Sequence, residues 1–287
     1  MEHYTNNKMI TDNKTNFVYF SALLPQRYPK FFQELEAVLR EKRIEYGLLP
    51  HTKDIWCRDY MPVQTPKGDF VQFNYDPRYL KPKRYWRRRT NAAKTCRAIG
   101  IRSLLSDIRL DGGNVVMSRT KAILTDRIFH ENTHYLKDKL IKELKRLLKV
   151  RQVIIIPECL DDLFGHADGM VRFLSEDTVL VNDYSHEPAF QKNLYRSLKG
   201  AKLDLKPIPY NPYCNKGELN ATGIYINYLQ VCRTILCPIY GMKEDALAHE
   251  VFLKYFGANV IPIRANAIAK KGGVLNCVSW NIFKERN

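Results

Sequence analysis

One cysteine near the end of the chain has a setting that suggests chemistry rather than packing. Cys277 follows two adjacent glycines in the stretch "KKGGVLNCVSWN". Paired glycines let the backbone turn sharply or let another group approach closely. A free thiol is mostly protonated at neutral pH, so a nucleophilic cysteine needs surroundings that favour its thiolate. The function of Cys277 therefore depends on the side chains that the fold brings to it.

A histidine and a carboxylate stand two residues apart in "FGHADGMVRF". His166 and Asp168 would point to the same side of an extended segment, and such a pair suits proton transfer. A metal site would need further ligands at short spacing, which His186 and His249 do not supply in their predicted contexts. The pattern favours acid–base chemistry that requires no metal and no organic cofactor.

Two further loops carry residues suited to a flat cation. The segment "DIWCRDYMP" places Trp56, Arg58 and Asp59 directly after a predicted strand. An aromatic face beside a carboxylate suits a planar cation, which stacks on the ring and donates paired hydrogen bonds. The alternative is a core tryptophan beside an Arg58–Asp59 salt bridge. The segment "LDGGN" adds Asp111 and Asn114 around a glycine pair that would let the backbone approach a ligand.

Carboxylates close to a thiol raise its pKa, which conflicts with a reactive Cys277. The conflict disappears if the substrate itself carries a positive charge. A guanidinium held between Asp59 and Asp168 would neutralise both acids and favour the thiolate. The residues thus predict a local acidic site for a small cation, in a chain whose formal net charge is +16.

Five strand–helix–strand units recur at intervals of roughly 50 to 60 residues, which is typical of a repeat architecture. Gly200 and Gly257 are expected to cap the fourth and fifth helices. The expected strand, helix and strand of the units lie at 16–23, 28–43 and 44–50; 69–75, 83–100 and 101–110; 121–129, 134–149 and 150–157; 177–184, 187–200 and 202–210; and 233–240, 243–257 and 258–264.

Two α/β architectures fit this repeat: a closed ring with pseudo-fivefold symmetry and a doubly wound open sheet. A polar loop follows the last strand of nearly every unit, and the candidate residues lie in these loops. Equivalent ends of the units of a ring meet at its axis, so a ring would collect the loops around one pocket. No linker or low-complexity segment divides the chain, and we expect a single domain over 1–287.

Five segments, "DIWCRDYMP", "LDGGN", "GHADGMVRF", "YIN" and "GGVLNC", resemble the motif set of the agmatine deiminase and Porphyromonas-type peptidylarginine deiminase family, within the guanidine-modifying superfamily. The resemblance runs through essentially the whole chain, in the family's order. It implies an α/β fold, a five-bladed propeller of pseudo-fivefold ββαβ units (the pentein fold), in agreement with the repeat. The chain departs from the family at Met61-Pro62, where Gly-Pro is usual, and at Asn276, where many agmatine deiminases have His.

The resemblance also implies roles for individual residues. Cys277 would be the nucleophile and His166 the general acid/base, while Asp59 and Asp168 would hold the guanidinium. Trp56 would wall the pocket and Asn227 would support it. The expected substrate-binding residues are Trp56, Arg58, Asp111, Asn114 and Asn227.

The function so implied is hydrolytic deimination of a small guanidinium substrate through a covalent Cys277 thiouronium. Agmatine, converted to N-carbamoylputrescine and ammonia, is the leading substrate, which would make the protein a hydrolase acting on C–N bonds of linear amidines in polyamine biosynthesis. Glu218 and Asp111 would suit the distal ammonium of agmatine, whereas Arg58 and Arg264 would suit the carboxylate of free arginine or peptidylarginine. An amidinotransferase is a further alternative.

The strong positive charge raises the alternative of a basic nucleic-acid-binding protein on the same scaffold. The densest basic cluster is "KPKRYWRRR" at 81–89, and elsewhere lysines pair with Glu on predicted helices, so we interpret the charge as solvated surface. No apolar run approaches the ~20 residues of a membrane span. Seven scattered cysteines without a CxxC unit and a polar N-terminal stretch predict a cytoplasmic protein. A homodimer is compatible with such rings, although no surface in the sequence points to one.

Overall fold

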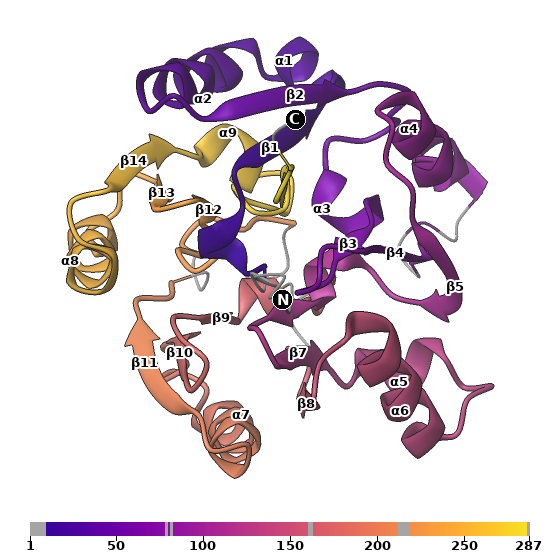
Figure 1. Cartoon of the computed structure of the whole chain (residues 1–287). Coiled ribbons are helices and arrows are strands. Elements are labelled where there is room, and N and C mark those ends of the chain that lie inside the picture. Colours follow the sequence, from indigo (N-terminus) through magenta and orange to yellow (C-terminus); the bar gives the residue numbers. More distant parts are fainter. Residues whose placement is uncertain (1–9, 78–79, 81–82, 160–162, 212–218, 286–287) are drawn as a thin grey trace, which may run out of the picture.

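The computed structural model describes residues 10–77, 80, 83–159, 163–211 and 219–285, except for the side chains of 83–85. In this part of the chain, fifteen strands form five three-stranded sheets that radiate from a common axis (Figure 1). In strand order the sheets are β15-β1-β2, β3-β4-β5, β6-β7-β8, β9-β10-β11 and β12-β13-β14. This arrangement confirms the five-bladed α/β propeller and excludes an open doubly wound sheet.

Every blade repeats the same order of strands. A strand near the axis pairs antiparallel with a middle strand, which pairs parallel with an outer strand. The inner strands are β3 (Val63–Gln64), β6 (Val116–Met117), β9 (Val171–Phe173), β12 (Leu229–Val231) and β15 (Ser279–Ile282). The middle strands are β1 (Phe17–Ser21), β4 (Phe70–Asn74), β7 (Lys121–Thr125), β10 (Thr178–Asn182) and β13 (Thr234–Ile239). The outer strands are β2 (Glu45–Leu49), β5 (Leu104–Arg109), β8 (Gln152–Ile156), β11 (Asp204–Ile208) and β14 (Val260–Arg264).

Helices at the rim connect each parallel pair of strands (Figure 1), because parallel neighbours need a crossover connection. The main rim helices are α2 (Pro29–Glu41), α4 (Ala92–Ala98), α6 (Lys137–Leu148), α7 (Pro188–Gly200) and α8 (Glu244–Phe256). Shorter helices precede three of them: α1 (Leu23–Arg27), η3 (Lys83–Arg88) and α5 (Arg127–Glu131). Among the described residues, every helix is too short or too polar to cross a membrane.

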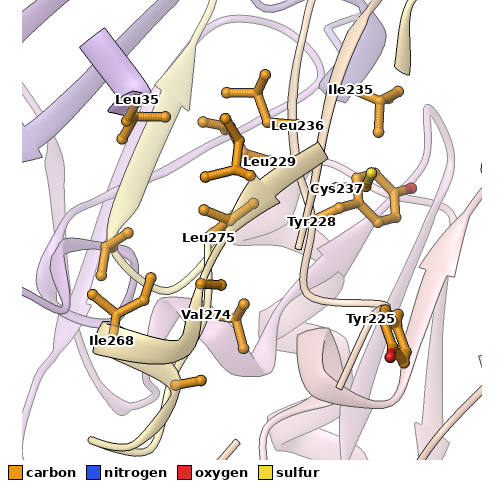
Figure 2. Packing of buried hydrophobic residues seen from close by; sticks show 14 of the residues in the cluster. Leu35, Tyr225, Tyr228, Leu229, Ile235, Leu236, Cys237, Ile268, Val274 and Leu275 are labelled. Atoms are coloured by element: carbon orange, nitrogen blue, oxygen red, sulfur yellow. The ribbon is translucent and has the colours of Figure 1, made fainter. Parts of the chain in front are cut away.

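The hydrophobic core is built where middle strands meet helices and neighbouring blades. All five residues of β1 are buried, as expected for a strand that is covered on both faces. The largest buried cluster joins Leu35 of α2, Leu229 of β12 and Leu236 of β13 to Val274 and Leu275 (Figure 2). The last two residues directly precede Asn276 and Cys277, so the core anchors the loop that carries the cysteine.

The end of the chain completes the first blade. β15 pairs antiparallel with β1, with Phe17 opposite Ile282 and Phe20 opposite Ser279. The short helix η1 (Asp12–Lys14) lies against β12. Segments from both ends of the sequence therefore lie beside the inner strands, close to the axis.

Two local expectations were wrong. The stretch 83–100 is not one helix: η3 ends at Arg88, and Asn91 starts α4 by accepting a 3.0 Å hydrogen bond from the Lys94 amide. Gly200 is the last residue of α7 rather than its cap, and the chain turns at Lys202, whose φ is 60°. Gly257 does end α8, with a φ of 69° that favours glycine.

The basic run at 81–89 lies partly outside the described residues. Trp86, Arg87 and Arg88 are exposed, and Arg89 forms a 2.7 Å ion pair with Asp76. This exposure agrees with a solvated surface, while nucleic-acid binding stays an untested alternative.

Candidate active site

Short helices that follow the outer strands meet near the axis. α3 (Cys57–Tyr60) follows β2, η4 (Gly112–Asn114) follows β5, and η5 (Ala167–Gly169) follows β8. α3 contacts η4, and η4 contacts η5. Cys277 comes after β14 and the short helix α9 (Asn266–Ala269). The loops that the ring was expected to gather are therefore side by side.

His166 lies between two carboxylates in this cluster. Its Nδ1 is 3.4 Å from Asp59 Oδ1 and its Nε2 is 3.1 Å from Asp111 Oδ2, and all three side chains are buried. Burial alone would lower the pKa of His166, but Asp59, the hydrogen bond and charge of Asp111, and Asp168 together raise the pKa to about 10. The imidazole is thus protonated at neutral pH and able to donate a proton.

Asp59 is a buried carboxylate whose hydrogen-bond acceptors are not all used by the protein. Burial raises its pKa to about 7; His166 opposes this rise, and Asp111 and Asp168 add to it. Within the described part of the chain, the buried Asp59 Oδ1 accepts no hydrogen bond of regular geometry, although it lies 3.4 Å from His166 Nδ1 in an ion pair. Buried carboxylate oxygens almost always have a donor. Asp59 is therefore well suited to accept N–H groups from a ligand.

Asn227 fixes the cysteine loop to the histidine loop. Its Oδ1 accepts a 3.2 Å hydrogen bond from the Cys277 amide, and its carbonyl accepts a 3.1 Å bond from the Asn276 amide. Its Nδ2 donates to the Asp168 carbonyl at 3.3 Å. Because Val274 is buried in the core (Figure 2), the position of the sulfur relative to η5 is set from two sides.

The sulfur of Cys277 faces an anion. Cys277 Sγ lies 4.0 Å from Asp168 Oδ2, and the same oxygen accepts a 2.6 Å hydrogen bond from Asn276 Nδ2. Burial, and then the charges of Asp168 and Asp59, raise the pKa of the half-buried Cys277 thiol well above its ordinary value. The thiol is therefore neutral in the ligand-free protein. This agrees with the expectation that carboxylates close to Cys277 raise the pKa of its thiol.

Two glycines make room for this convergence. A Cβ at Gly113 would lie 2.6 Å from Asp59 Oδ1 and 2.7 Å from His166 Nδ1. A Cβ at Gly273 would lie 2.5 Å from the Trp56 ring and 3.0 Å from Cys277 Cβ. Real Cβ contacts are longer than this, so only glycine fits at either position without a shift of its neighbours. The glycine pairs thus permit close approach of side chains, as their sequence context indicated.

The chain matches a known family over most of its length. The sequence profile of the Porphyromonas-type peptidyl-arginine deiminase family matches residues 26–282. The chain belongs to this family. A Streptococcus mutans relative is 25% identical over 225 residues, which cover 66% of this chain and 60% of that protein. The agmatine deiminase of Pseudomonas aeruginosa (strain LESB58) is 23% identical over 203 residues, 60% of this chain and 54% of that enzyme. The alignments thus span a little over half of the length of these curated relatives.

Solved structures agree in fold with this deiminase-family chain. C. jejuni agmatine deiminase superposes with a TM-score of 0.76 at 18% identity, over 96% of both chains. The DDAH of Pseudomonas aeruginosa superposes with a TM-score of 0.58 at 12% identity, over 93% of this chain and 99% of the other. These similarities support the pentein fold that the five sheets define.

Three residues expected to bind substrate have other partners in this deiminase-family chain. Asp111 is hydrogen-bonded to His166. Asn114 Oδ1 accepts hydrogen bonds from the amide and hydroxyl of Thr125, each at 3.0 Å, and from the Ala167 amide at 3.2 Å. The Arg58 guanidinium bonds to Asn276 and Asn281. All three hold parts of the site in place, and the alternative Arg58–Asp59 salt bridge is not among the ion pairs of the described residues.

Other expected features of the deiminase motifs have local explanations. His166 and Asp168 point the same way, as predicted, but the segment is a 3₁₀ turn rather than a strand. Met61 replaces the usual glycine at no backbone cost, because its φ of −81° and ψ of 154° suit any residue. Within the described ranges, no group of three or more His, Cys, Asp or Glu side chains is arranged to hold a metal ion.

Two residues at the site were not assigned by sequence reasoning. Phe164 lies with its ring centroid 6.1 Å from that of His166, and its ring also abuts Gly272. Asn276 was noticed only as a departure from the family, although its position next to Cys277 is the signal that marks it. Half-buried Trp56 packs against the edge of the core beside Gly273, as a pocket wall would.

A cavity of about 70 Å³ is bordered by Asp168 and Asn276. Its walls also include Arg58, Arg172 and Asp12, whereas Cys277 and His166 do not border it; its other polar or backbone lining comes from Thr11, Thr15, Gln64, Gly112 and Asn281. The Arg172–Asp12 ion pair at 2.6 Å attaches η1 to this wall. The cavity therefore does not border the Cys277 thiol or the His166 imidazole.

Proposed function

We propose that the protein hydrolyses a guanidinium substrate, with loss of ammonia, through a covalent bond to Cys277. The observation that carries the proposal is the excess of buried carboxylates. Asp59 and Asp111 lie against the imidazolium of His166, and Asp168 lies beside the thiol, so carboxylates outnumber cationic groups among the side chains in direct contact with the imidazole and the sulfur. Together with the unbonded Asp59 Oδ1 and the nearby thiol, this supports a ligand that is cationic, rich in N–H donors and electrophilic at carbon.

The proposed first half-reaction begins when the guanidinium enters. Its charge neutralises Asp59 and Asp168, which removes the main anions that keep the Cys277 thiol protonated. The thiol releases its proton to solvent, and the resulting thiolate attacks the central guanidinium carbon and forms a C–S bond. The protonated His166 donates its proton to the departing nitrogen, which leaves as ammonia, and a cationic thiouronium remains on the sulfur.

The second half-reaction uses water. The now neutral His166 takes a proton from a water molecule as it attacks the same carbon. The C–S bond breaks as the hydroxyl of the adduct gives its proton to the released ammonia, which becomes ammonium, and the ureido product forms. Cys277 leaves as the thiolate and regains a proton from solvent when the product departs. Overall, one guanidinium and one water give a ureido compound and ammonium. The carboxylates Asp59 and Asp168 orient the nitrogens throughout, because bidentate acceptance fixes a planar donor.

Agmatine is the proposed substrate. Relatives in Pseudomonas aeruginosa and C. jejuni are named as agmatine deiminases, which supports this choice by association. In the described part of the chain, the two arginines considered for a substrate carboxylate are engaged or exposed: Arg58 bonds to Asn276 and Asn281, and Arg264 ends β14 at the surface. Glu218, considered for the distal ammonium, lies outside the described residues. Free arginine and peptidylarginine are the alternatives to be tested.

The proposal includes the wider expectations from the sequence. The protein would be a hydrolase of linear amidines in polyamine biosynthesis, acting as a single domain over 1–287. The six described cysteines are all free, which agrees with a reducing, cytoplasmic environment. A homodimer stays a prediction.

A substrate panel tests the proposal. Purified protein is incubated with agmatine, arginine, methylated arginine and an arginyl peptide, and ureido product and ammonia are measured, with Cys277→Ala as the control. Ureido product from agmatine well above that from the others supports the proposal. Preference for arginine or the peptide overturns the substrate, and ammonia without ureido product, or no turnover of any guanidine, overturns hydrolysis.

A further inference from the structure

The side-chain amide of Asn276 is held in one orientation by opposite charges. Its Nδ2 donates to Asp168 Oδ2 at 2.6 Å, and its Oδ1 accepts from Arg58 Nη2 at 3.1 Å. If the amide were flipped, its oxygen would face a carboxylate and its N–H groups would face a guanidinium. Both contacts would be repulsive, because carboxylates only accept and guanidinium groups only donate hydrogen bonds.

Arg58 grips the backbone around the cysteine as well. Its Nε donates to the Asn276 carbonyl at 3.4 Å, and its own amide donates to the Cys277 carbonyl at 3.2 Å. Its Nη2 also donates to Asn281 Oδ1. The two peptide groups on either side of Cys277 are thus tied to one arginine.

Arg58 lies beside a cavity that is separate from the thiol and the imidazole. It lines the cavity of about 70 Å³ that Cys277 and His166 do not border. Among the described residues, Arg58 has no carboxylate within ion-pair distance; the charges of Asp12 and Asp168 act on it from further away, and Asn276 is bonded to both Arg58 and Asp168. A direct contact with a substrate at the sulfur would require it to release both asparagines.

From these contacts we infer that Arg58 is a positioning residue for Asp168 and Cys277, acting through the amide of Asn276. Arg58 orients the Asn276 amide, and the amide holds Asp168 Oδ2 at its place 4.0 Å from the sulfur. The inference rests on the proposed function, because Asp168 and Cys277 have their roles there. Asn276 stands where many agmatine deiminases have histidine. In this inference Asn276 holds Asp168 in place, and its own orientation depends on Arg58.

A double-mutant cycle tests the inference in the intact protein. Arg58→Met keeps the length of the side chain without its donors, and Asn276→Ala removes the amide. We expect each change to lower kcat/KM for agmatine by at least about tenfold, since small misplacements of reacting groups are costly. The double variant should be no more than about threefold worse than the poorer single variant, because both remove the same link. Arg58→Lys, which keeps one donor near Asn276 Oδ1, should recover at least about threefold over Arg58→Met.

Arg109→Met provides a matched control. Arg109 is partly exposed and its side chain pairs with Asp76 at 3.5 Å, and its variant should stay within about twofold of the wild type. Multiplicative effects of Arg58→Met and Asn276→Ala would overturn the inference. So would an Arg58→Met variant that loses activity on arginine while keeping that on agmatine, because this would indicate a direct contact with a substrate carboxylate. If Arg58→Met does not fold, Arg58→Gln replaces it in the cycle.

A second measurement does not need turnover. Chloroacetamidine and chloroacetamide alkylate thiols and differ in the positive charge of the amidinium. The rate with chloroacetamidine divided by the rate with chloroacetamide, both measured at Cys277, reports how strongly the charge of Asp168 attracts a cation to the sulfur. The ratio should fall in Arg58→Met and Asn276→Ala and fall no further in the double variant. If no guanidine is hydrolysed but this pattern holds, the proposed reaction fails while the positioning role stands; an unchanged ratio in both single variants overturns the positioning role.

Discussion

Asp168 Oδ2 lies 4.0 Å from Cys277 Sγ, so a carboxylate is directly beside the thiol. An anion at this distance works against thiolate formation, since it raises the energy of a second negative charge. A conventional cysteine nucleophile has a cationic partner for this purpose. In the proposed mechanism the substrate brings this positive charge, so reactivity and substrate recognition would be coupled: a ligand that neutralises Asp168 would activate the sulfur.

Removing the sulfur should abolish turnover and leave binding intact. We expect Cys277→Ser to lower kcat for ureido formation by at least about 1,000-fold. The carboxylates that hold the guanidinium are unchanged, so calorimetry should still detect agmatine binding, and thermal unfolding should show a folded protein. Turnover within tenfold of the wild type would exclude Cys277 as the nucleophile.

Removing the anion should make the resting thiol more reactive while stopping catalysis. Asp168→Asn keeps the shape of the side chain but removes a charge that raises the pKa of Cys277. We expect alkylation of Cys277 by iodoacetamide at pH 8 to become at least about threefold faster, because more thiolate is present. Asp107→Asn, at an exposed carboxylate bonded to Tyr135, is the control and should leave the rate unchanged. Slower alkylation in Asp168→Asn would contradict the electrostatic account.

The pH dependence of kcat/KM should follow Asp59 and His166. Asp59 must lose its proton to hold the guanidinium, and its pKa is raised to about 7, so activity should rise through that pH. His166 must keep its proton to serve as the acid, and its pKa is about 10, so activity should fall above that pH. The macroscopic values belong to the interacting pair. A profile that falls between pH 6 and 8 would rule out this assignment of protonation states.

The space beside Gly273 should be required for a productive sulfur. In Gly273→Ala the new methyl would press on the Trp56 ring and on Cys277 Cβ. The ring or the cysteine must then shift by several tenths of an ångström. We expect kcat/KM to fall at least about tenfold while the thermal unfolding midpoint changes little. Gly200→Ala, where a Cβ would meet nothing within 4 Å, is the matched control and should leave activity unaltered.

The ring could be predicted from the sequence because the repeat was visible. Five similar units with polar loops after their last strands leave few closed arrangements, and all five predicted strand pairs are present as parallel pairs. The inner strands were not assigned from the residues. β3 and β6 are only two residues long, so they carry no periodic pattern to detect.

The convergence of the site could also be predicted, whereas the direction of individual side chains could not. Cys277, His166, Asp59 and Asp168 have chemistry that is evident from residue type and from the resemblance. Whether Arg58 points toward a ligand or behind the site depends on packing around the axis, which no local pattern encodes. Asn276, Asn281 and Arg58 meet only because the chain end returns to the first blade.

The buried carboxylate Asp59 should reduce stability above neutral pH. Its folded-state pKa is raised to about 7, whereas an unfolded aspartate titrates near ~3.9, so the stability of the fold falls as the pH rises from about 4 to about 7 and does not change further above that. Asp59→Asn stays neutral, and we expect its free energy of unfolding to exceed that of the wild type by about 1–3 kcal/mol at pH 8. At about pH 4, close to the pKa of an unfolded aspartate, the two proteins should be nearly equal. Urea unfolding at both pH values measures this difference. Asp69→Asn, which removes a carboxylate from a surface ion pair with Lys149, is the control for the general effect of losing one negative charge. A wild type more stable than Asp59→Asn at pH 8 would mean that Asp59 already has the partners that the proposed guanidinium is meant to supply.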